Sequence, residues 1–189
     1  IVSIIANYFV ITVKWFAKFR DFSGDFFRLT DLSFAPILWL LSAVLILYFI
    51  RKVFNISRWH GPAEAVYASH RTDNELDLKR GIGSTFAALV SLCGGAPVGQ
   101  YGPLVNFGAT IASFFSQLIK INLVTPAILM SCGVAAAISA GFNAPIAGII
   151  FAHEAVLRHF SLKALLPIAV ASTISAAFGS WAFGGEALF

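Results

Sequence analysis

A glycine-rich break between two apolar segments carries the residue types best suited to chemistry in this chain. It reads Cys-Gly-Gly-Ala-Pro-Val-Gly-Gln-Tyr-Gly-Pro over residues 93–103 and ends with Gly99, Gln100, Tyr101, Gly102 and Pro103. Glycine permits sharp turns and close approach of the backbone, and proline is favoured in the first turn of a helix. The start of a helix presents N–H groups and a partial positive charge. The pattern therefore predicts an anion site at residues 99–103 that uses the backbone instead of a charged side chain.

Two other breaks repeat the combination of small residues and proline. Gly61 and Pro62 follow Trp59 and His60, and a later break contains Phe142, Asn143, Ala144 and Pro145. We predict that Pro62, Pro103 and Pro145 each stand in the first turn of a helix, with Gly61 and residues 99–102 in the turns just before. A nucleotide-binding P-loop does not fit, because Gly102 is followed by Pro-Leu where that motif needs Lys-Ser or Lys-Thr.

The composition identifies the surrounding medium as lipid. Hydrophobic residues make up 58% of the 189 residues and charged residues 12%, with a mean hydropathy of +0.82. Soluble domains carry roughly twice that charged fraction. The net charge of +4 is small and scattered, so no nucleic-acid partner is expected. Cys93 and Cys132 lie in apolar sequence, which favours packing over a disulfide or a metal site. We expect no catalytic residues, no cofactor and no enzyme activity.

The elements that must position these breaks are apolar segments of helical length. Helices are expected at residues 1–19, 34–50, 63–69, 81–92, 104–119, 127–138, 146–159 and 161–183, with polar connections at 21–30 and 70–80. Several are shorter than the roughly 20 residues of a full membrane span, and short helices that meet at breaks can expose their ends to an ion. The sequence predicts an all-α membrane protein with broken helices and one transmembrane region over residues 1–189. The first segment could instead be an interfacial amphipathic helix. Basic residues lie on both sides of the predicted membrane segments, so they do not determine the orientation of the protein in the membrane.

The motifs resemble those of the CLC family of chloride channels and chloride/proton exchangers. Gly-Gln-Tyr-Gly-Pro at 99–103 is similar to the family's GxxGP segment, and residues 142–151 match its FNAPxAGxxF signature. Trp-His-Gly-Pro at 59–62 lies where the family carries GSGIP. The order and spacing of all three segments agree. The resemblance implies broken, tilted helices that form the first of two inverted repeats, with the second half absent from this sequence. It also implies a homodimer and a multi-pass protein of the cell (inner) membrane.

The resemblance further implies which residues form the site and which have been replaced. The family holds an anion at helix N-termini, which correspond here to Gly61, Pro62 and residues 99–103. Tyr101 takes the place of the gating glutamate, Ala155 that of the inner proton-transfer glutamate, and Trp59, by a looser match, that of the ion-contacting serine. A carboxylate can both block the path and carry a proton, whereas a phenol with a pKa near ~10 relays protons poorly at neutral pH.

Each of these residues also has a structural interpretation. Tyr101 could pack beside the loop, and Trp59 is interpreted as a packing or interfacial aromatic more readily than as an ion ligand. His153 and Glu154 are ionisable residues in an apolar segment and are candidates for proton handling. Glu154 could instead form an ordinary i,i+4 ion pair with Arg158. The asparagines Asn106 and Asn143 are expected to cap or satisfy broken backbone, with a direct ion contact as the alternative.

The predicted function is transport of chloride or a similar small anion. The replaced carboxylates favour passive, channel-like conduction. One alternative is chloride/proton exchange with a proton path rerouted through His153 or Glu154. An alternative of another class is a transport-inactive structural or regulatory membrane protein. Anion flux would distinguish this last alternative from the other two, and proton movement would distinguish conduction from exchange.

Overall fold

Long apolar segments form helices here because a helix pairs its own backbone groups, as a lipid environment requires. The computed structural model describes residues 1–26, 35–71, 76–99, 101–118 and 125–183, and within these ranges it contains helices and no strand. In chain order these are α1 (Val2–Phe26), α2 (Ala35–Val53), α3 (Pro62–His70), α4 (Leu78–Cys93), α5 (Tyr101–Leu118), α6 (Pro126–Phe142), α7 (Pro145–Phe151), the π-helix η1 (Ala152–Leu157) and α8 (Leu162–Phe183). The predicted all-α fold of broken helices is confirmed.

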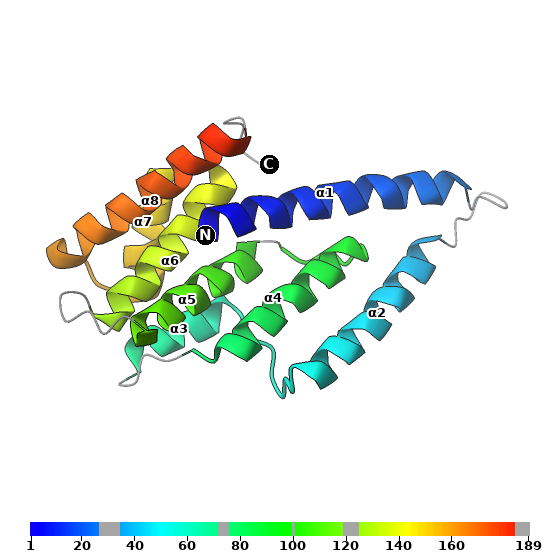
Figure 1. Ribbon diagram of the computed structural model, residues 1–189, viewed down its shortest axis with the longest axis horizontal. Coiled ribbons are helices and arrows are strands. Elements are labelled where there is room, and N and C mark those ends of the chain that lie inside the picture. Colours follow the sequence, from blue (N-terminus) through cyan, green and yellow to red (C-terminus); the bar gives the residue numbers. More distant parts are fainter. Residues whose placement is uncertain (27–34, 72–75, 100, 119–124, 184–189) are drawn as a thin grey trace.

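Helix α6 lies at the centre of the packing. It contacts α1, α3, α5, α7, η1 and α8, and Figure 1 shows it running between α5 and α8. Small residues allow helices to approach closely where no hydrophobic effect drives them together. At the crossing of α5 and α6, a Cβ atom added to Gly108 would collide with the backbone of Gly133, and one added to Gly133 would collide with the carbonyl oxygen of Gly108. Glycine at both positions therefore sets the distance between these helices.

The outer surfaces of the helices are apolar. Helix α2 packs on α4 and α1 at the edge of the molecule (Figure 1). Its large apolar side chains are exposed, Leu45 for example at 72%. Leu166 on α8 is equally exposed, at 72%. By length and composition, the α1 segment Val2–Phe22 and helix α8 are both long and apolar enough to cross a membrane. Such surfaces suit a protein whose solvent is lipid.

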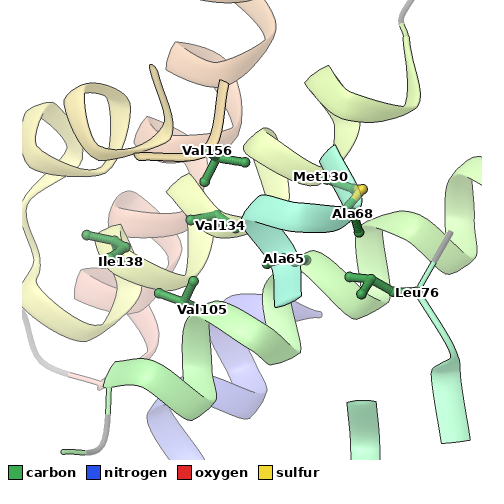
Figure 2. Close-up of a cluster of buried hydrophobic side chains, with 9 residues drawn as sticks. Ala65, Ala68, Leu76, Val105, Met130, Val134, Ile138 and Val156 are labelled. Carbon is green, nitrogen blue, oxygen red and sulfur yellow. The ribbon is translucent and has the colours of Figure 1, made fainter. Parts of the chain in front are cut away.

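A buried cluster fixes the short helix α3 among longer ones. Figure 2 shows Ala65 and Ala68 of α3 enclosed by side chains from α5, α6 and η1. The cluster consists of Ala65, Ala68, Leu76, Val105, Ala109, Met130, Val134, Ile138 and Val156. At the C-terminal end of α3, the Ser69 hydroxyl lies 3.0 Å from the carbonyl oxygen of Val156 in η1. These contacts hold α3 in place while its N-terminal end remains outside the cluster.

Serine hydroxyls join helices that are distant in sequence. Ser3 of α1 donates to the carbonyl oxygen of Ser175 at 3.0 Å, and Ser175 of α8 donates to that of Ala136 in α6 at 2.7 Å. Ser172 of α8 donates to the carbonyl oxygen of Pro145 at 2.6 Å and contacts the hydroxyl of Ser139. The break between α6 and α7 is therefore fastened to α8 by hydrogen bonds within the helix bundle.

Several expected boundaries were wrong. Helix α1 runs on to Phe26 through the start of the polar connection expected at 21–30, because a charged side chain such as Asp21, which points to the surface, does not end a helix. Helix α6 continues to Phe142 through residues expected in a break, since Gly141 and its small neighbours pack tightly without leaving the helix. Residues 146–159 form α7 and then η1 instead of one α-helix.

Candidate anion site

Helix α3 begins directly after Gly61. This residue has extended backbone, with φ −145° and ψ −170°, and Pro62 is the first helical residue. The carbonyl oxygen of Gly61 accepts from the N–H of Glu64 at 3.0 Å, and no side chain caps the helix start. Gly61 is half-buried and Pro62 exposed. The start of α3 therefore carries the partial positive charge of a helix end without a side-chain cap.

Helix α5 begins beside it. The chain leaves α4 at Cys93, and α5 starts at Tyr101, so the predicted interruption between the two helices is confirmed. A Cβ atom added to Gly102 would lie 3.4 Å from Cγ of Pro62, which places the first turns of α5 and α3 side by side. Gly99 is exposed, with open space around it, and Gln100 lies outside the described residues.

The predicted positions of the three prolines are confirmed, but the turn before Pro103 is shorter than predicted. Pro62 and Pro145 are the first residues of α3 and α7, and Pro103 is the third residue of α5. Tyr101 and Gly102 were expected in the preceding turn but already belong to α5. The earlier start is possible because the N–H groups of the whole first turn have no partner within the helix, so Pro103 removes no hydrogen bond there.

Tyr101 packs against the end of α6. Its ring stacks on that of Phe142, with centroids 3.8 Å apart and planes 13° from parallel, and a Cβ atom on Gly141 would lie 3.3 Å from Cε1 of Tyr101. The ring is half-buried. The first turn of α5 is thereby joined to the second signature, Phe-Asn-Ala-Pro. This arrangement is the packing geometry that the sequence left as an alternative to a gate.

The break between α6 and α7 is held by its own polar side chain. Asn143 ends α6 in the left-handed region, with φ 50°, which asparagine tolerates better than most residues. Its Oδ1 accepts from the Ser180 hydroxyl of α8 at 2.9 Å. Ala144 follows and Pro145 opens α7. Asn143 thus stands at the C-terminal cap position of α6 and anchors the break to α8 through a side-chain bond, while its predicted role in satisfying broken backbone stays a prediction.

Trp59 and His60 lie in the irregular segment before α3. The backbone N–H of His60 donates to the Ser84 hydroxyl of α4 at 2.9 Å, which holds the segment on that helix. The side chain of Trp59 is 43% exposed. An indole on the outer surface of a membrane protein is a common interfacial anchor, so its surroundings favour the packing interpretation over an ion ligand.

The proposed proton residues lie away from the two helix starts. His153, Glu154 and Ala155 belong to η1, which meets α3 at Ser69, near the C-terminal end of that helix. Pro62 stands at the other end of α3, separated from Ser69 by roughly 10 Å of helix. The structure therefore brings Gly61, Pro62, Gly102 and Tyr101 together, whereas the η1 residues lie at the other end of α3.

His153 is buried, whereas Glu154 and Arg158 are exposed. The His153 side chain is 6% exposed; its Nδ1 lies 3.1 Å from the carbonyl oxygen of Ile149, and its Nε2 is buried without a hydrogen-bond partner among the described residues. Because a carbonyl only accepts, Nδ1 carries the proton of the neutral ring. The expected Glu154–Arg158 ion pair was wrong: no such pair forms in the described chain, since the π-helix changes the i,i+4 geometry and Arg158 leaves it with φ 56°.

A polar cavity of about 520 Å³ beside α3 contains residues that the sequence analysis had not singled out. His60 and Glu64 line it near the start of α3, and Arg71, Asp77 and Arg80 line it near the other end. The signal for His60 was present in the sequence, because an ionisable residue stands immediately before the Gly-Pro of a predicted anion site. Glu64 had no such signal.

Comparison with known proteins identifies the relatives of this chain. A sequence model of the family described as Voltage gated chloride channel matches residues 38–189. The chain is 27% identical over 121 residues to a putative chloride channel protein ClcB-like of Ralstonia nicotianae, an alignment covering 62% of this chain and 28% of that protein. It is 27% identical over 138 residues to the voltage-gated ClC-type chloride channel ClcB of Citrobacter koseri, covering 71% and 32%.

The corresponding ClcB of Escherichia coli gives the longest of these three alignments. Identity is 26% over 175 residues, covering 88% of this chain and 40% of that protein. The chain thus spans between 28% and 40% of the length of these relatives. The family match covers most of the chain and includes the starts of α3, α5 and α7. The chain belongs to the voltage-gated chloride channel family, the CLC family.

Proposed function

We propose that the protein passes chloride or a similar small anion across a membrane, passively and without obligatory proton exchange. The observation that carries this proposal is the contact between Gly102 and Pro62, which sets the N-terminal turns of α5 and α3 side by side. Two sets of N–H groups and two positive helix ends then face one region. Partial charges can replace part of the hydration of an anion while binding it weakly enough for release.

The family supports the choice of ion. The relatives described above are named as chloride channels, and the alignments to them cover most of this chain. Gly61, Pro62 and residues 99–103 are the proposed pore residues, and no enzyme chemistry or cofactor is needed. The chain contributes one set of helix starts, and we infer that the complete protein places further groups around the same ion.

Passive conduction is inferred from the residues that replace carboxylates. Tyr101 stands at the position of the gate, with its ring stacked on Phe142, and Ala155 stands at that of the inner proton site. An alanine holds no proton, and a phenol gives one up only at high pH. Anion movement therefore has no titratable partner at either of these positions.

The experiment is a chloride flux assay on the complete protein in liposomes. We expect chloride efflux that depolarises the vesicles. Gly102→Val should reduce the flux several-fold, because its branched side chain would push Pro62 away and separate the two helix starts. Leu45→Val, on the outer face of α2, is the control and should leave the flux unchanged. No flux from the unmodified protein would overturn the proposal and favour a structural or regulatory role.

Chloride/proton exchange is the second candidate, and the buried, unpartnered Nε2 of His153 favours it. An imidazole nitrogen without a donor is a ready proton acceptor. The discriminating measurement is the pH inside liposomes under a chloride gradient. Uphill proton movement in a fixed ratio to chloride, lost in His153→Gln, would replace passive conduction with exchange through η1.

A further inference from the structure

The cavity beside α3 lies along that helix, and His60, the residue before Gly61, is part of its lining. It is lined by residues of α3, the start of α4 and the end of α5, namely Glu64, Tyr67, Arg71, Asp77, Arg80 and Gln117, with His60 at the end nearest Pro62. Its arginines are engaged: Nε of Arg80 lies 3.3 Å from the Asp77 carboxylate, and the Arg71 guanidinium lies 5.8 Å from the centroid of the Tyr67 ring. Ala68, Leu76 and Leu78 complete the lining, but most of the side chains are polar or charged, which suits water and ions.

His60 has a ring nitrogen with no partner. Its Nδ1 is enclosed by protein and makes no hydrogen bond within the described part of the chain, while its backbone is fixed by the hydroxyl of Ser84. Buried polar atoms are normally satisfied by protein, water or a ligand. His60 is bonded directly to Gly61, so a ligand at its ring would lie close to the N-terminal turn of α3.

Glu64 lies in the first turn of α3 and lines the same cavity. It is half-buried, and among the described residues it forms no ion pair. A carboxylate there opposes an anion that approaches the helix start. His60 and Glu64 therefore lie at the start of α3, whereas the residues of η1 meet its other end.

We propose that His60 is a proton-binding residue that sets the affinity of the proposed anion site, with Glu64 opposing the anion. This inference rests on the proposed function. An imidazolium beside Gly61 adds a full positive charge to the partial charge of the helix end. Binding of a proton and binding of the anion then favour each other by the same factor, as linkage requires. No proton needs to cross the membrane.

The sign of the effect follows from the groups that face His60. Protonation strengthens anion binding, so affinity is higher in acid and falls as the pH rises through the range in which histidine loses its charge, about pH 5 to 8. The charged groups that share the cavity with His60 are Glu64, Asp77, Arg71 and Arg80, and Arg80 is paired with Asp77. Tyr67 and Gln117 also line it.

The test measures chloride flux at sub-saturating chloride, at about pH 5.5 and about pH 7.5. The complete unmodified protein should conduct several-fold faster at the lower pH. His60→Gln keeps a polar side chain but cannot become charged, so its flux should be the same at both values. His159→Gln, an exposed histidine that follows η1, is the matched control and should retain the full pH dependence. Glu64→Gln removes the negative charge that opposes the anion, so its flux should be higher than that of the unmodified protein at both pH values.

A second measurement keeps the proposal testable if His60→Gln fails to fold. With Cys93 and Cys132 replaced by alanine, Glu64→Cys should react with a water-soluble thiosulfonate, and chloride should slow the reaction. A thiol that does not react would show that the cavity is closed and would overturn the proposal. So would pH-dependent flux that survives in His60→Gln, or pH-independent flux in the unmodified protein. Absence of flux from the unmodified protein would instead refute the proposed function itself.

Discussion

At the scale of single residues, the proposal of passive conduction depends most on Tyr101. Its ring lies flat on Phe142 and against Gly141, which removes it from free solution at the start of α5. A gating carboxylate acts by competing with the anion and withdrawing when protonated. A stacked phenol does neither at neutral pH. The residue identity could be read from the sequence, but the stack could not, because Phe142 lies on another helix.

Replacement of Tyr101 by alanine should change anion flux by less than about twofold, well under the ~1.4 kcal/mol of a tenfold change, because we propose that this residue serves the pore through its backbone while its ring is held on Phe142. The same variant should lower stability by roughly 1 kcal/mol through loss of the ring stack. Liposome flux and thermal unfolding in detergent measure the two effects. A several-fold rise in flux would show that the ring obstructs the path.

A carboxylate at this position should behave differently. Tyr101→Glu should introduce a pH-sensitive block, with flux low when the carboxylate is charged and higher when it is protonated in acid. It should not create proton exchange unless Ala155→Glu is added, because a single carboxylate leaves no second group on the inner side to accept the proton. Proton movement under a chloride gradient, measured in the single and double variants, tests this. Exchange by the single variant would show that another residue already serves as the inner proton acceptor.

At the scale of elements, the breaks were predictable and the helix lengths less so. Proline and glycine fix a helix start locally, which is why the positions of Pro62, Pro103 and Pro145 were predicted correctly. Small residues such as Gly141 have two uses, in a break and in a tightly packed helix, and only the contacts of α6 show which one applies. The π-helix over Ala152–Leu157 has no local sequence signature, so the Glu154–Arg158 pair was expected wrongly. The adjacency of α3 and α5 followed from family resemblance, not from any pattern in the residues.

The crossing of α5 and α6 should be the least tolerant contact in the fold. A side chain at Gly108 or Gly133 meets backbone that cannot move aside, so Gly133→Ala should destabilise the protein by about 1–3 kcal/mol, as overpacking does. Gly179→Ala on α8 is the matched control, since the nearest atom to its Cβ would be Nδ2 of Asn7 at 3.5 Å. Thermal unfolding in detergent compares the two. Equal stabilities would show that the helices can separate slightly at no cost.

The hydroxyl of Ser172 should contribute measurably to the junction of α6, α7 and α8. It is buried and contacts both the Pro145 carbonyl oxygen and Ser139. Ser172→Ala should lower stability by about 1 kcal/mol, the scale of an interhelical hydrogen bond in a membrane. Thr173→Ala is the adjacent control, because that exposed hydroxyl bonds only to carbonyl oxygens of its own helix. A loss of stability in the control equal to that of Ser172→Ala would contradict the assignment.

At the scale of the whole molecule, exposed apolar surface can meet either lipid or another protein. Apolar side chains are exposed on α2 and on α7 and α8 alike, and composition does not separate a face that meets lipid from one that meets protein. The resemblance separates them, because it implies a homodimer formed through residues 146–159 and 161–183, with a pore in each subunit. We therefore propose that the α7–α8 face is buried between two copies of the protein and that the α2 face contacts lipid.

Cross-linking in membranes tests this assignment with two residues of equal exposure. Leu166 on α8 and Leu45 on α2 are both 72% exposed. In the complete protein, with its other cysteines replaced, Leu166→Cys and Ile150→Cys should give covalent dimers with a flexible bis-maleimide, and Leu45→Cys should give monomers. A buried interface can form here because both helices carry few charges, so their association leaves few polar groups unpaired. Dimers from Leu45→Cys alone would place the interface on α2, and monomers from all three variants would exclude a dimer through either face.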